Sequence, residues 1–352
     1  MEVFIPAKRQ VDKILIVGSG SIGLKHLGVI KELLPNCHVA FLHHSTKEKI
    51  IDGANKSFFS IENAFEFAAD IVVLANPSSF HIELARKLMR PCVKFLIEKP
   101  ISNSTYGLNN FLEECNAFNA NVTIGYNLRY LDSLNYFRNQ IKNDLIGKVH
   151  SIRAEVGQNL ATWREGVDYK NTSSASSYLG GGVLLELSHE IDYLLWIFGG
   201  IEWVQSSIFK HKYRELDVED TSLTIINFNN IDNNRQISCS LNMDFMRHDS
   251  VRNCYAIGDK STLLWDGVNG IVSIFNPDIS KWNVLFHATD ELTKSYINLW
   301  KAILEMPDHP SDSKATIKDG IDVLMVVEAI KKSSKDEERV YLNRSAGLFY
   351  ER

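Results

Sequence analysis

Two short segments of the chain carry side chains that could move a proton. Glu98-Lys99-Pro100 directly follows the apolar run 93–97. A lysine at the end of a buried strand can exchange a proton with a hydroxyl, because partial burial lowers a lysine pKa toward the working range. Farther along, His189 opens a predicted helix with Asp192 one turn later. This spacing suits either a general acid/base pair or a solvated surface couple, and periodicity leaves both open.

A glycine turn near the start of the chain could hold a phosphate group. Gly18, Gly20 and Gly23 lie between the apolar run Lys13–Val17 and a helical pattern at 24–34. In a dinucleotide-binding turn the first glycine permits the tight turn, the second admits the pyrophosphate and the third lets the helix pack closely. Ser21 and Ile22 would open the helix, whose N-terminus attracts anions. The alternative is an ordinary turn.

The ends of the following strands would complete a cofactor site. The second strand ends in His43-His44-Ser45, without the carboxylate that usually meets the ribose of NAD. His44, Ser45 and Lys47 would suit a 2′-phosphate, which favours NADP over NAD, or they are simply polar loop residues. Further predicted cofactor contacts come from the ends of the next two strands: Asn76, Pro77, His81, Glu98 and Lys99.

The elements that position these residues alternate in the first part of the chain. Strand-like apolar runs alternate with helical patterns, a rhythm typical of a parallel sheet covered on both faces. We predict a Rossmann-like dinucleotide-binding domain over residues 1–126. Its expected strands are 13–17, 39–42, 71–75, 93–97 and 122–126, and its expected helices 24–34, 61–68, 80–89 and 104–119.

The rhythm changes in the second part, where strands follow one another with short turns. This pattern predicts an α+β substrate-binding and oligomerisation domain over residues 127–335, with a large, open-faced and mostly antiparallel sheet, then a tail over 336–352. The expected strands are 149–156, 204–210, 223–228, 236–243, 255–257, 262–265, 271–275 and 284–286; the expected helices are 292–304 and 315–331, separated by the breaker 307–310.

Composition excludes several classes of protein. The 352 residues have a formal net charge of −5 and no basic block, which argues against nucleic-acid binding. Five cysteines without a C-x-x-C pair indicate a reduced, cytoplasmic protein and no zinc site. We expect no signal peptide and no membrane span, so the partners should be small molecules.

The motifs together resemble the Gfo/Idh/MocA family of NAD(P)-dependent sugar and cyclitol oxidoreductases. They are 18–23, 75–81, 98–100, 125–130, 180–192, 318–320 and 326–329. The resemblance implies hydride transfer between nicotinamide and a substrate carbon, with Lys99 and His189 handling the hydroxyl proton. Relatives often carry Asp four residues before the histidine, whereas here Glu186 lies three before it. Either Glu186 or Asp192 would orient His189.

A later segment resembles relatives from cell-surface polysaccharide metabolism. Trp163-Arg164 is followed by Asp168-Tyr169-Lys170, and these residues with Arg129 could form a cationic rim. Arginine can grip a carboxylate or phosphate with two hydrogen bonds, so an acidic or nucleotide-linked sugar would suit. The alternative is that Arg and Lys serve surface solubility. We expect Trp163, Arg164, Tyr169 and Arg129 to bind substrate.

Other functions stay open on the sequence alone. The protein could be a dinucleotide-binding sensor without catalysis, or an enzyme that recycles a tightly bound NAD for net epimerisation or hydrolysis. Alternating apolar residues of the second-domain sheet, Ile237, Cys239, Leu241 and Met243, would need a cover. We therefore expect a homodimer or homotetramer formed through that sheet.

Overall fold

The chain divides into two units by its internal contacts. The structure is a computed structural model that describes residues 11–44, 51–163, 166–212, 215–230, 235–306, 312–343 and 348–350. Unit 1 comprises Met1–Asn76, Phe80–Glu98 and Gly107–Thr123, and unit 2 comprises Pro77–Ser79, Lys99–Tyr106 and Ile124–Arg352. Two short segments from the first part of the sequence, Lys99 among them, thus belong to unit 2.

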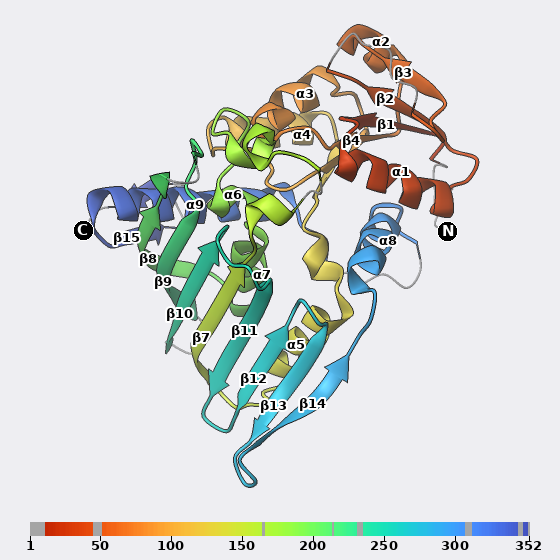
Figure 1. The fold of residues 1–352 in the computed structure, drawn as a ribbon. Helices are drawn as coiled ribbons and strands as arrows, with labels where there is room; N and C mark the ends of the chain where they lie inside the picture. Colours follow the sequence, from red (N-terminus) through yellow and green to blue (C-terminus); the bar gives the residue numbers. More distant parts are fainter. Residues whose placement is uncertain are drawn as a thin grey trace, which may run out of the picture. The chain divides into compact units, whose positions relative to one another are not determined.

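Unit 1 is built on a six-stranded sheet with helices (Figure 1). The strand order is β3-β2-β1-β4-β5-β6, and the registers of β1 with β2 and β4 are parallel. Apart from the first residues of β1, β2 and β5, which are Lys13, His38 and Lys94, the core strands are apolar and buried, which agrees with the predicted Rossmann-like architecture. The strands are β1 (Lys13–Val17), β2 (His38–Leu42), β3 (Lys56–Phe58), β4 (Ile71–Leu74), β5 (Lys94–Ile97) and β6 (Asn121–Ile124), and the helices α1 (Ser21–Leu33), α2 (Ile61–Glu66), α3 (His81–Lys87) and α4 (Leu108–Ala117).

Unit 2 contains a ten-stranded sheet in the order β14-β13-β12-β11-β7-β10-β9-β8-β15-β16. Its pairs are antiparallel except β7 with β10, which confirms the predicted mostly antiparallel sheet. The strands are β7 (Val149–Gly157), β8 (Ile201–Phe209), β9 (Thr221–Asn230), β10 (Arg235–Asp244), β11 (Val251–Gly258), β12 (Thr262–Asp266), β13 (Ile271–Asn276), β14 (Lys281–His287), β15 (Val340–Asn343) and β16 (Leu348–Tyr350).

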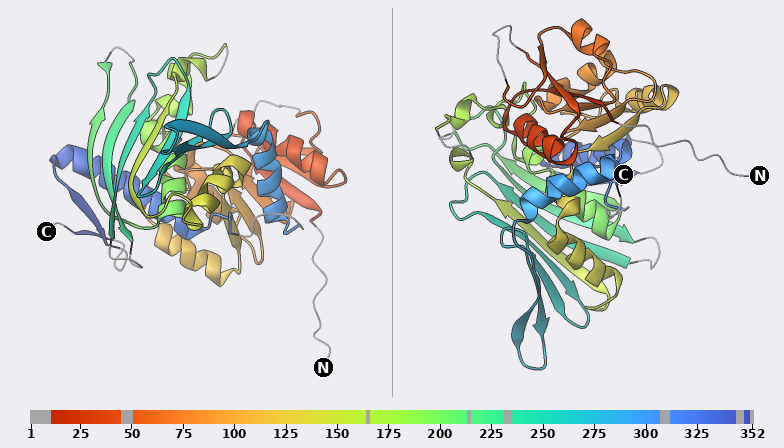
Figure 2. Two further views of the ribbon diagram at one scale, coloured as in Figure 1. Left: turned by 90° about the horizontal axis from the view of Figure 1, so that it is seen from below. Right: turned by 90° about the vertical axis from the view of Figure 1, so that its right-hand side faces the viewer.

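Helices cover one face of the unit 2 sheet (Figures 1 and 2). Helices α5 (Asp132–Lys142), α6 (Val183–Glu186) and α9 (Ile317–Asp336) contact its strands. The other helices of unit 2 are α7 (His189–Phe198) and α8 (Glu291–Ile303), and the short 3-10 turns are η1 (Ser78–Phe80), η2 (Asn127–Tyr130), η3 (Leu160–Thr162), η4 (Tyr169–Asn171) and η5 (Ser173–Ala175). Helix α9 begins after Thr316 because Thr316 and Asp319 form a reciprocal capping box.

Short strands at the sheet edges escaped the sequence analysis. In unit 1, β3 has only three residues, of which Phe58 alone is apolar, so no alternating run marks it. In unit 2, β15 pairs with β8 through Val340 opposite Val204, within the stretch expected as a tail. The breaker 307–310 lies outside the described residues. In the described part of the chain, no helix is long and apolar enough to span a membrane.

The apolar alternation of β10 faces inward, which corrects the expectation that it forms an uncovered surface. Ile237, Cys239, Leu241 and Met243 are all buried within the protein, on the face that packs against helices such as α6 and α9. Alternation shows which residues share a face but not which face is covered. On the opposite face, Leu223 and Ile225 of β9 are 46% and 52% exposed.

Candidate active site

The glycine turn of unit 1 has the backbone geometry that a tight strand–helix connection requires. Gly18 has φ +98°, and a Cβ there would lie 2.7 Å from the carbonyl oxygen of Ala75. A Cβ on Gly23 would lie 2.1 Å from the carbonyl oxygen of Gly18. Side chains at either position would therefore collide with backbone atoms, so the turn and the close approach of α1 both depend on glycine.

The same turn leaves room for a phosphate. A Cβ on Gly20 would meet no atom within 4 Å, and α1 starts at Ser21 with Ile22 next. The first turn of this 13-residue helix contains no acidic residue, so its N-terminal dipole can act on an anion. These residues fit a dinucleotide pyrophosphate, and the contacts of Ser21 and Ile22 with a cofactor stay predictions.

The end of β2 separates two neighbouring histidines. His43 is buried, stacks on the rings of Phe41 and Phe59, and lies 3.1 Å from the Ser57 hydroxyl through Nε2. His44 is exposed, and no carboxylate occupies positions 42 to 44. Ser45 and Lys47 lie outside the described residues. Among the described residues at the end of β2, His44 is therefore the exposed side chain available to a ligand.

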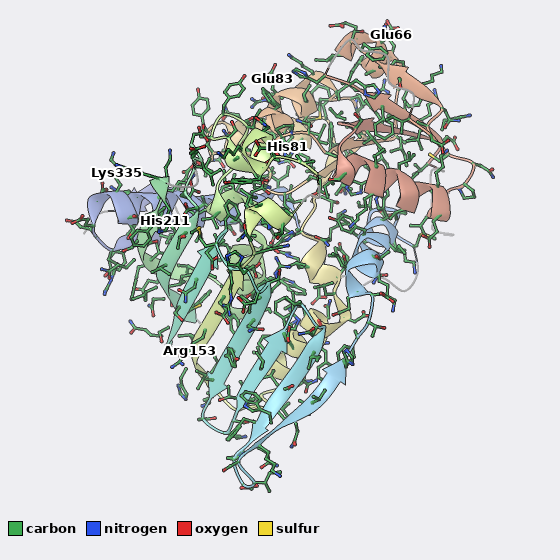
Figure 3. The ribbon with its side chains drawn as sticks, viewed as in Figure 1. Glu66, His81, Glu83, Arg153, His211 and Lys335 are labelled. Atoms are coloured by element: carbon green, nitrogen blue, oxygen red, sulfur yellow. The ribbon has the colours of Figure 1, made fainter. Side chains whose placement is uncertain are left out.

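The turn after β4 is fixed by a histidine of α3. The Nε2 atom of His81 lies 2.8 Å from the carbonyl oxygen of Asn76 (labelled His81 in Figure 3). His81 is buried, so its imidazole holds the turn rather than reaching out of it. Pro77 belongs to unit 2. The predicted contacts of Asn76, Pro77 and His81 with nicotinamide stay predictions.

The Glu98 side chain has a buried partner that sequence reasoning missed. Its Oε1 atom lies 2.9 Å from Nε2 of His26, and both residues are buried in unit 1. His26 stands on α1 three residues after Gly23, a local spacing that could have drawn attention to it. The pair ties the helix of the glycine turn to the end of β5.

Lys99 of unit 2 meets the segment that carries Glu186. Its Nζ atom donates a hydrogen bond of 2.6 Å to the carbonyl oxygen of Glu186, and it lies 3.6 Å from Oε2 of the same residue. Both side chains are mostly but not fully buried. The carboxylate and the carbonyl dipole together hold the ammonium group in one place.

His189 begins α7, as the sequence predicted, and is held as a neutral imidazole. Burial, and then the positive charges of Lys99 and Arg252, lower its pKa well below the ordinary value. Its ring packs edge-on against Tyr126 at a centroid distance of 5.6 Å. The Nδ1 atom has no hydrogen-bond partner among the residues that the structure describes. A neutral imidazole beside an ammonium group can accept a proton at neutral pH.

Asp192 accepts hydrogen bonds from Arg129 and not from His189. Nε and Nη2 of Arg129 donate to the two oxygens of Asp192 at 2.9 and 2.7 Å, and Nη2 also donates to Asp319 at 2.9 Å. Burial raises the pKa of Asp192 to about 6, against the opposing effect of Arg129. In the described part of the chain, neither Asp192 nor Glu186 hydrogen-bonds to His189.

This pairing corrects the expectation for Arg129. The side chain is only 3% exposed, so it cannot form part of an exposed cationic rim. The arginine instead links η2 to α7 and α9. The sequence did place His189, Asp192 and Trp196 on one helix face, and Arg129 accordingly also lies over the Trp196 ring, with its Cζ 5.6 Å from the ring centroid.

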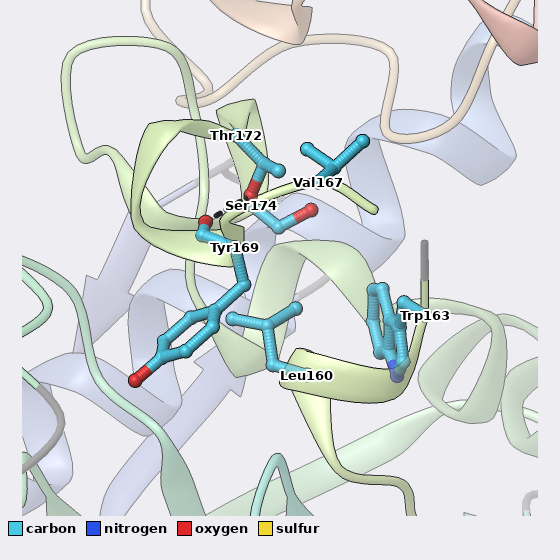
Figure 4. A pocket seen from close by; sticks show the side chains of 6 residues that line it. All are labelled: Leu160, Trp163, Val167, Tyr169, Thr172 and Ser174. Carbon is cyan, nitrogen blue, oxygen red and sulfur yellow. Dashed lines mark hydrogen bonds between the residues drawn. The ribbon is translucent and has the colours of Figure 1, made fainter. Parts of the chain in front are cut away.

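Two of the predicted substrate residues line one small pocket in unit 2. Figure 4 shows Trp163 and Tyr169 around it, and the full lining is Leu160, Trp163, Val167, Tyr169, Thr172 and Ser174. Trp163 is braced by the ring of Phe245, edge-on at 5.2 Å, and Thr172 donates to the Tyr169 carbonyl at 2.6 Å. Arg164 lies outside the described residues, and Lys170 pairs with Glu215 on the surface.

Comparison with known protein families agrees with both units. Residues 13–126 match the model of an oxidoreductase family with an NAD-binding Rossmann fold, and residues 135–264 match the GFO/IDH/MocA C-terminal domain. The chain belongs to the Gfo/Idh/MocA family of oxidoreductases. The predicted family is thereby confirmed.

Individual members of the Gfo/Idh/MocA family are distant in sequence. Glucose-6-phosphate 3-dehydrogenase of Bacillus subtilis is 27% identical over 53% of this chain and 53% of its own length. The rhizopine catabolism protein MocA of Rhizobium meliloti is 22% identical over 52% of this chain and 56% of its own length. The chain thus spans little more than half of the length of these relatives.

A solved structure shares the fold over nearly the whole chain. It is the WlbA dehydrogenase of Bordetella pertussis, in complex with NADH and UDP-GlcNAcA. The match has a TM-score of 0.74 at 18% identity and covers 95% of this chain and 99% of that one. At this identity the likeness concerns the fold alone.

Proposed function

We propose that the protein is an NAD(P)-dependent oxidoreductase that interconverts a secondary alcohol and a ketone of a sugar derivative. The observation that carries the proposal is the joint placement of Lys99 and a neutral His189 in unit 2. A nicotinamide, when bound, supplies the hydride acceptor or donor. The glycine turn at Gly18, Gly20 and Gly23, with the N-terminus of α1, would hold its pyrophosphate.

The residues of unit 2 would handle the proton of the substrate hydroxyl. In the oxidation direction, the hydroxyl proton passes to the His189 imidazole as the carbon loses hydride, and the C–O bond becomes a carbonyl. The Nζ ammonium of Lys99 donates a hydrogen bond to the same oxygen and stabilises its developing negative charge. Glu186 positions that ammonium through its carbonyl oxygen and carboxylate.

The cofactor is proposed to be NADP in preference to NAD. The support is the end of β2, where exposed His44 stands in place of a carboxylate. A carboxylate there would bind the ribose hydroxyls of NAD and repel a 2′-phosphate. An imidazole N–H can instead donate a hydrogen bond to the phosphate.

The substrate is proposed to be an acidic or nucleotide-linked sugar of surface-polysaccharide metabolism, in the cytoplasm. The aromatic pocket of Trp163 and Tyr169 supports a sugar ligand, and the similarity in fold to a dehydrogenase solved with UDP-GlcNAcA agrees with it. We further propose a homodimer or homotetramer through the outer sheet face that carries Leu223 and Ile225.

The proposed mechanism is tested by replacing Lys99. Lys99→Met keeps the aliphatic stem but removes the ammonium, so kcat should fall at least about 100-fold with cofactor affinity changed little. Turnover is followed by nicotinamide absorbance, and affinity by fluorescence titration with NADH and NADPH, which also tests the cofactor preference. The matched control is Lys87→Met, which removes an exposed lysine paired with Glu83. Normal turnover in Lys99→Met would exclude the mechanism.

A further inference from the structure

A cationic side chain of β11, Arg252, acts on the pKa of His189 but neither gives nor accepts the proton in the proposed mechanism. We propose that Arg252 binds an anionic group of the substrate, a carboxylate or a phosphate, next to His189, and that Glu190 is the residue that positions Arg252. The inference rests on the proposed function and names the feature of the sugar that this protein selects.

The strand places Arg252 on the inner face of the sheet. It is the second residue of β11 and pairs with Val156 of β7. Because side chains alternate along a strand, Arg252 shares its face with Cys254 and Ala256, which are buried. The helix side of the sheet is therefore the side that Arg252 enters, and its side chain keeps 23% exposure.

A buried carboxylate holds the guanidinium by one edge. The Nε atom of Arg252 donates a hydrogen bond of 3.0 Å to Oε1 of Glu190, which is fully buried and follows His189 in the chain. Within the described residues, the two terminal nitrogens of Arg252 make no hydrogen bond. Two parallel N–H donors on a fixed guanidinium match the two oxygens of a carboxylate or phosphate.

Arg252 and Lys99 act electrostatically on the same imidazole. The hydrogen bond to Glu190 attaches Arg252 to the residue that follows His189 in α7, and the charges of Arg252 and Lys99 both lower the pKa of His189. Glu186 faces Lys99, and Glu190 faces Arg252 from the buried side. A bound anion would balance the charge on the open side of Arg252, whereas a neutral sugar would leave the two terminal nitrogens unpaired.

Binding to the NADPH-loaded protein tests this independently of turnover. Calorimetry would compare glucuronic acid with glucose and UDP-glucuronic acid with UDP-glucose, pairs that differ only in the carboxylate. We expect the acid of at least one pair to bind at least about tenfold more tightly, as for a hydrogen bond to a charged group. Equal affinity within both pairs overturns the inference. It leaves the proposed function intact, since turnover of the neutral sugar is measured separately.

Variants assign the preference to Arg252. Arg252→Met combined with Glu190→Gln avoids a lone buried charge and should weaken acid binding about tenfold more than binding of the neutral partner. Arg252→Lys keeps the positive charge and should lose most of the preference, because an ammonium group lacks the two parallel N–H donors of a guanidinium. The control is Arg247→Met, an arginine paired with Glu155 and Asp249, which should keep the preference. An unchanged preference in both Arg252 variants overturns the inference.

The role of Glu190 in positioning Arg252 is tested by comparing KM with kcat. Glu190→Met should raise KM for the acid substrate without changing kcat, while Glu190→Gln, which still accepts a hydrogen bond from Nε, should restore most of the affinity. A purely structural role would lower thermal stability and shift KM for the acid and neutral sugars equally. That equal shift would remove Glu190 from the proposal.

Discussion

The glycine turn of unit 1 and the proton-transfer site of unit 2 are assembled in different ways. The turn is made within six consecutive residues, and its critical contact joins Gly23 to Gly18. The unit 2 site joins Lys99 to Glu186 across 87 positions and Arg252 to Glu190 across 62. The first depends on steric contacts of backbone atoms, one within the turn and one between Gly18 and Ala75. The second depends on charged side chains that distant elements bring together. Mutations in the turn should therefore lower dinucleotide affinity, whereas mutations in the charge network of unit 2 should lower stability.

The largest effect is expected from the turn. Gly23→Val places a side chain where even a Cβ would lie 2.1 Å from the Gly18 carbonyl, so α1 must move and dinucleotide affinity should fall at least about 100-fold. NADH fluorescence titration measures the loss. Gly28→Ala, on the same helix with no atom within 4 Å of the new Cβ, should bind normally. Equal loss in both variants would show that the turn is not the sensitive element.

A smaller effect, on stability, is expected from the charge network of unit 2. Arg129→Met leaves Asp192 buried without its partner and should lower the free energy of unfolding by about 3–5 kcal/mol. All six tryptophans lie in unit 2, so tryptophan fluorescence during urea unfolding reports this unit. The control Arg247→Met breaks exposed pairs with Glu155 and Asp249 in the same unit and should cost less than about 1 kcal/mol. Similar losses would contradict a buried network.

The smallest effect is expected in the pH dependence of stability and of kcat/KM. Because the pKa of His189 is lowered in the folded protein, the unfolded state binds more protons below about pH 6.5, and stability should decline as the pH falls through that range. The same shift should keep kcat/KM for alcohol oxidation constant through pH 6.5, with its acid limb well below. NMR of the His189 imidazole measures the titration. A His189 midpoint near 6.5 would contradict the assignment.

The sequence predicts what depends on neighbours along the chain. It identifies the glycine turn, the buried strands of unit 1, the strand run of unit 2 and the start of α7 at His189. Each of these follows from periodicity or from a steric demand within a few residues. Lys99 and His189 were singled out by their places at the ends of a strand and of a helix. The structure pairs Lys99 with Glu186, and the charges of Lys99 and Arg252 act on His189.

The features that the sequence did not predict depend on contacts between residues far apart in the chain. Arg129 looked like a rim residue because nothing local shows that Asp192 and Asp319 approach it. The alternation of β10 was interpreted correctly as a one-sided face, but the helices on that side of the sheet, such as α6 and α9, lie before and after it in the chain. Glu98 with His26, and Arg252 with Glu190, are likewise pairs whose partners only the folded chain reveals.

The parallel pairing of β7 with β10 has a consequence for synthesis of the protein. Ser151 of β7 pairs with Ser238 of β10, so the ribosome must add 87 further residues before this neighbour exists, and β11 comes later still. At translation rates of ~5–20 residues per second that interval is roughly 4–17 seconds. During it β7 has two open edges, and its charged residues Arg153 (labelled in Figure 3) and Glu155 oppose pairing with other nascent chains.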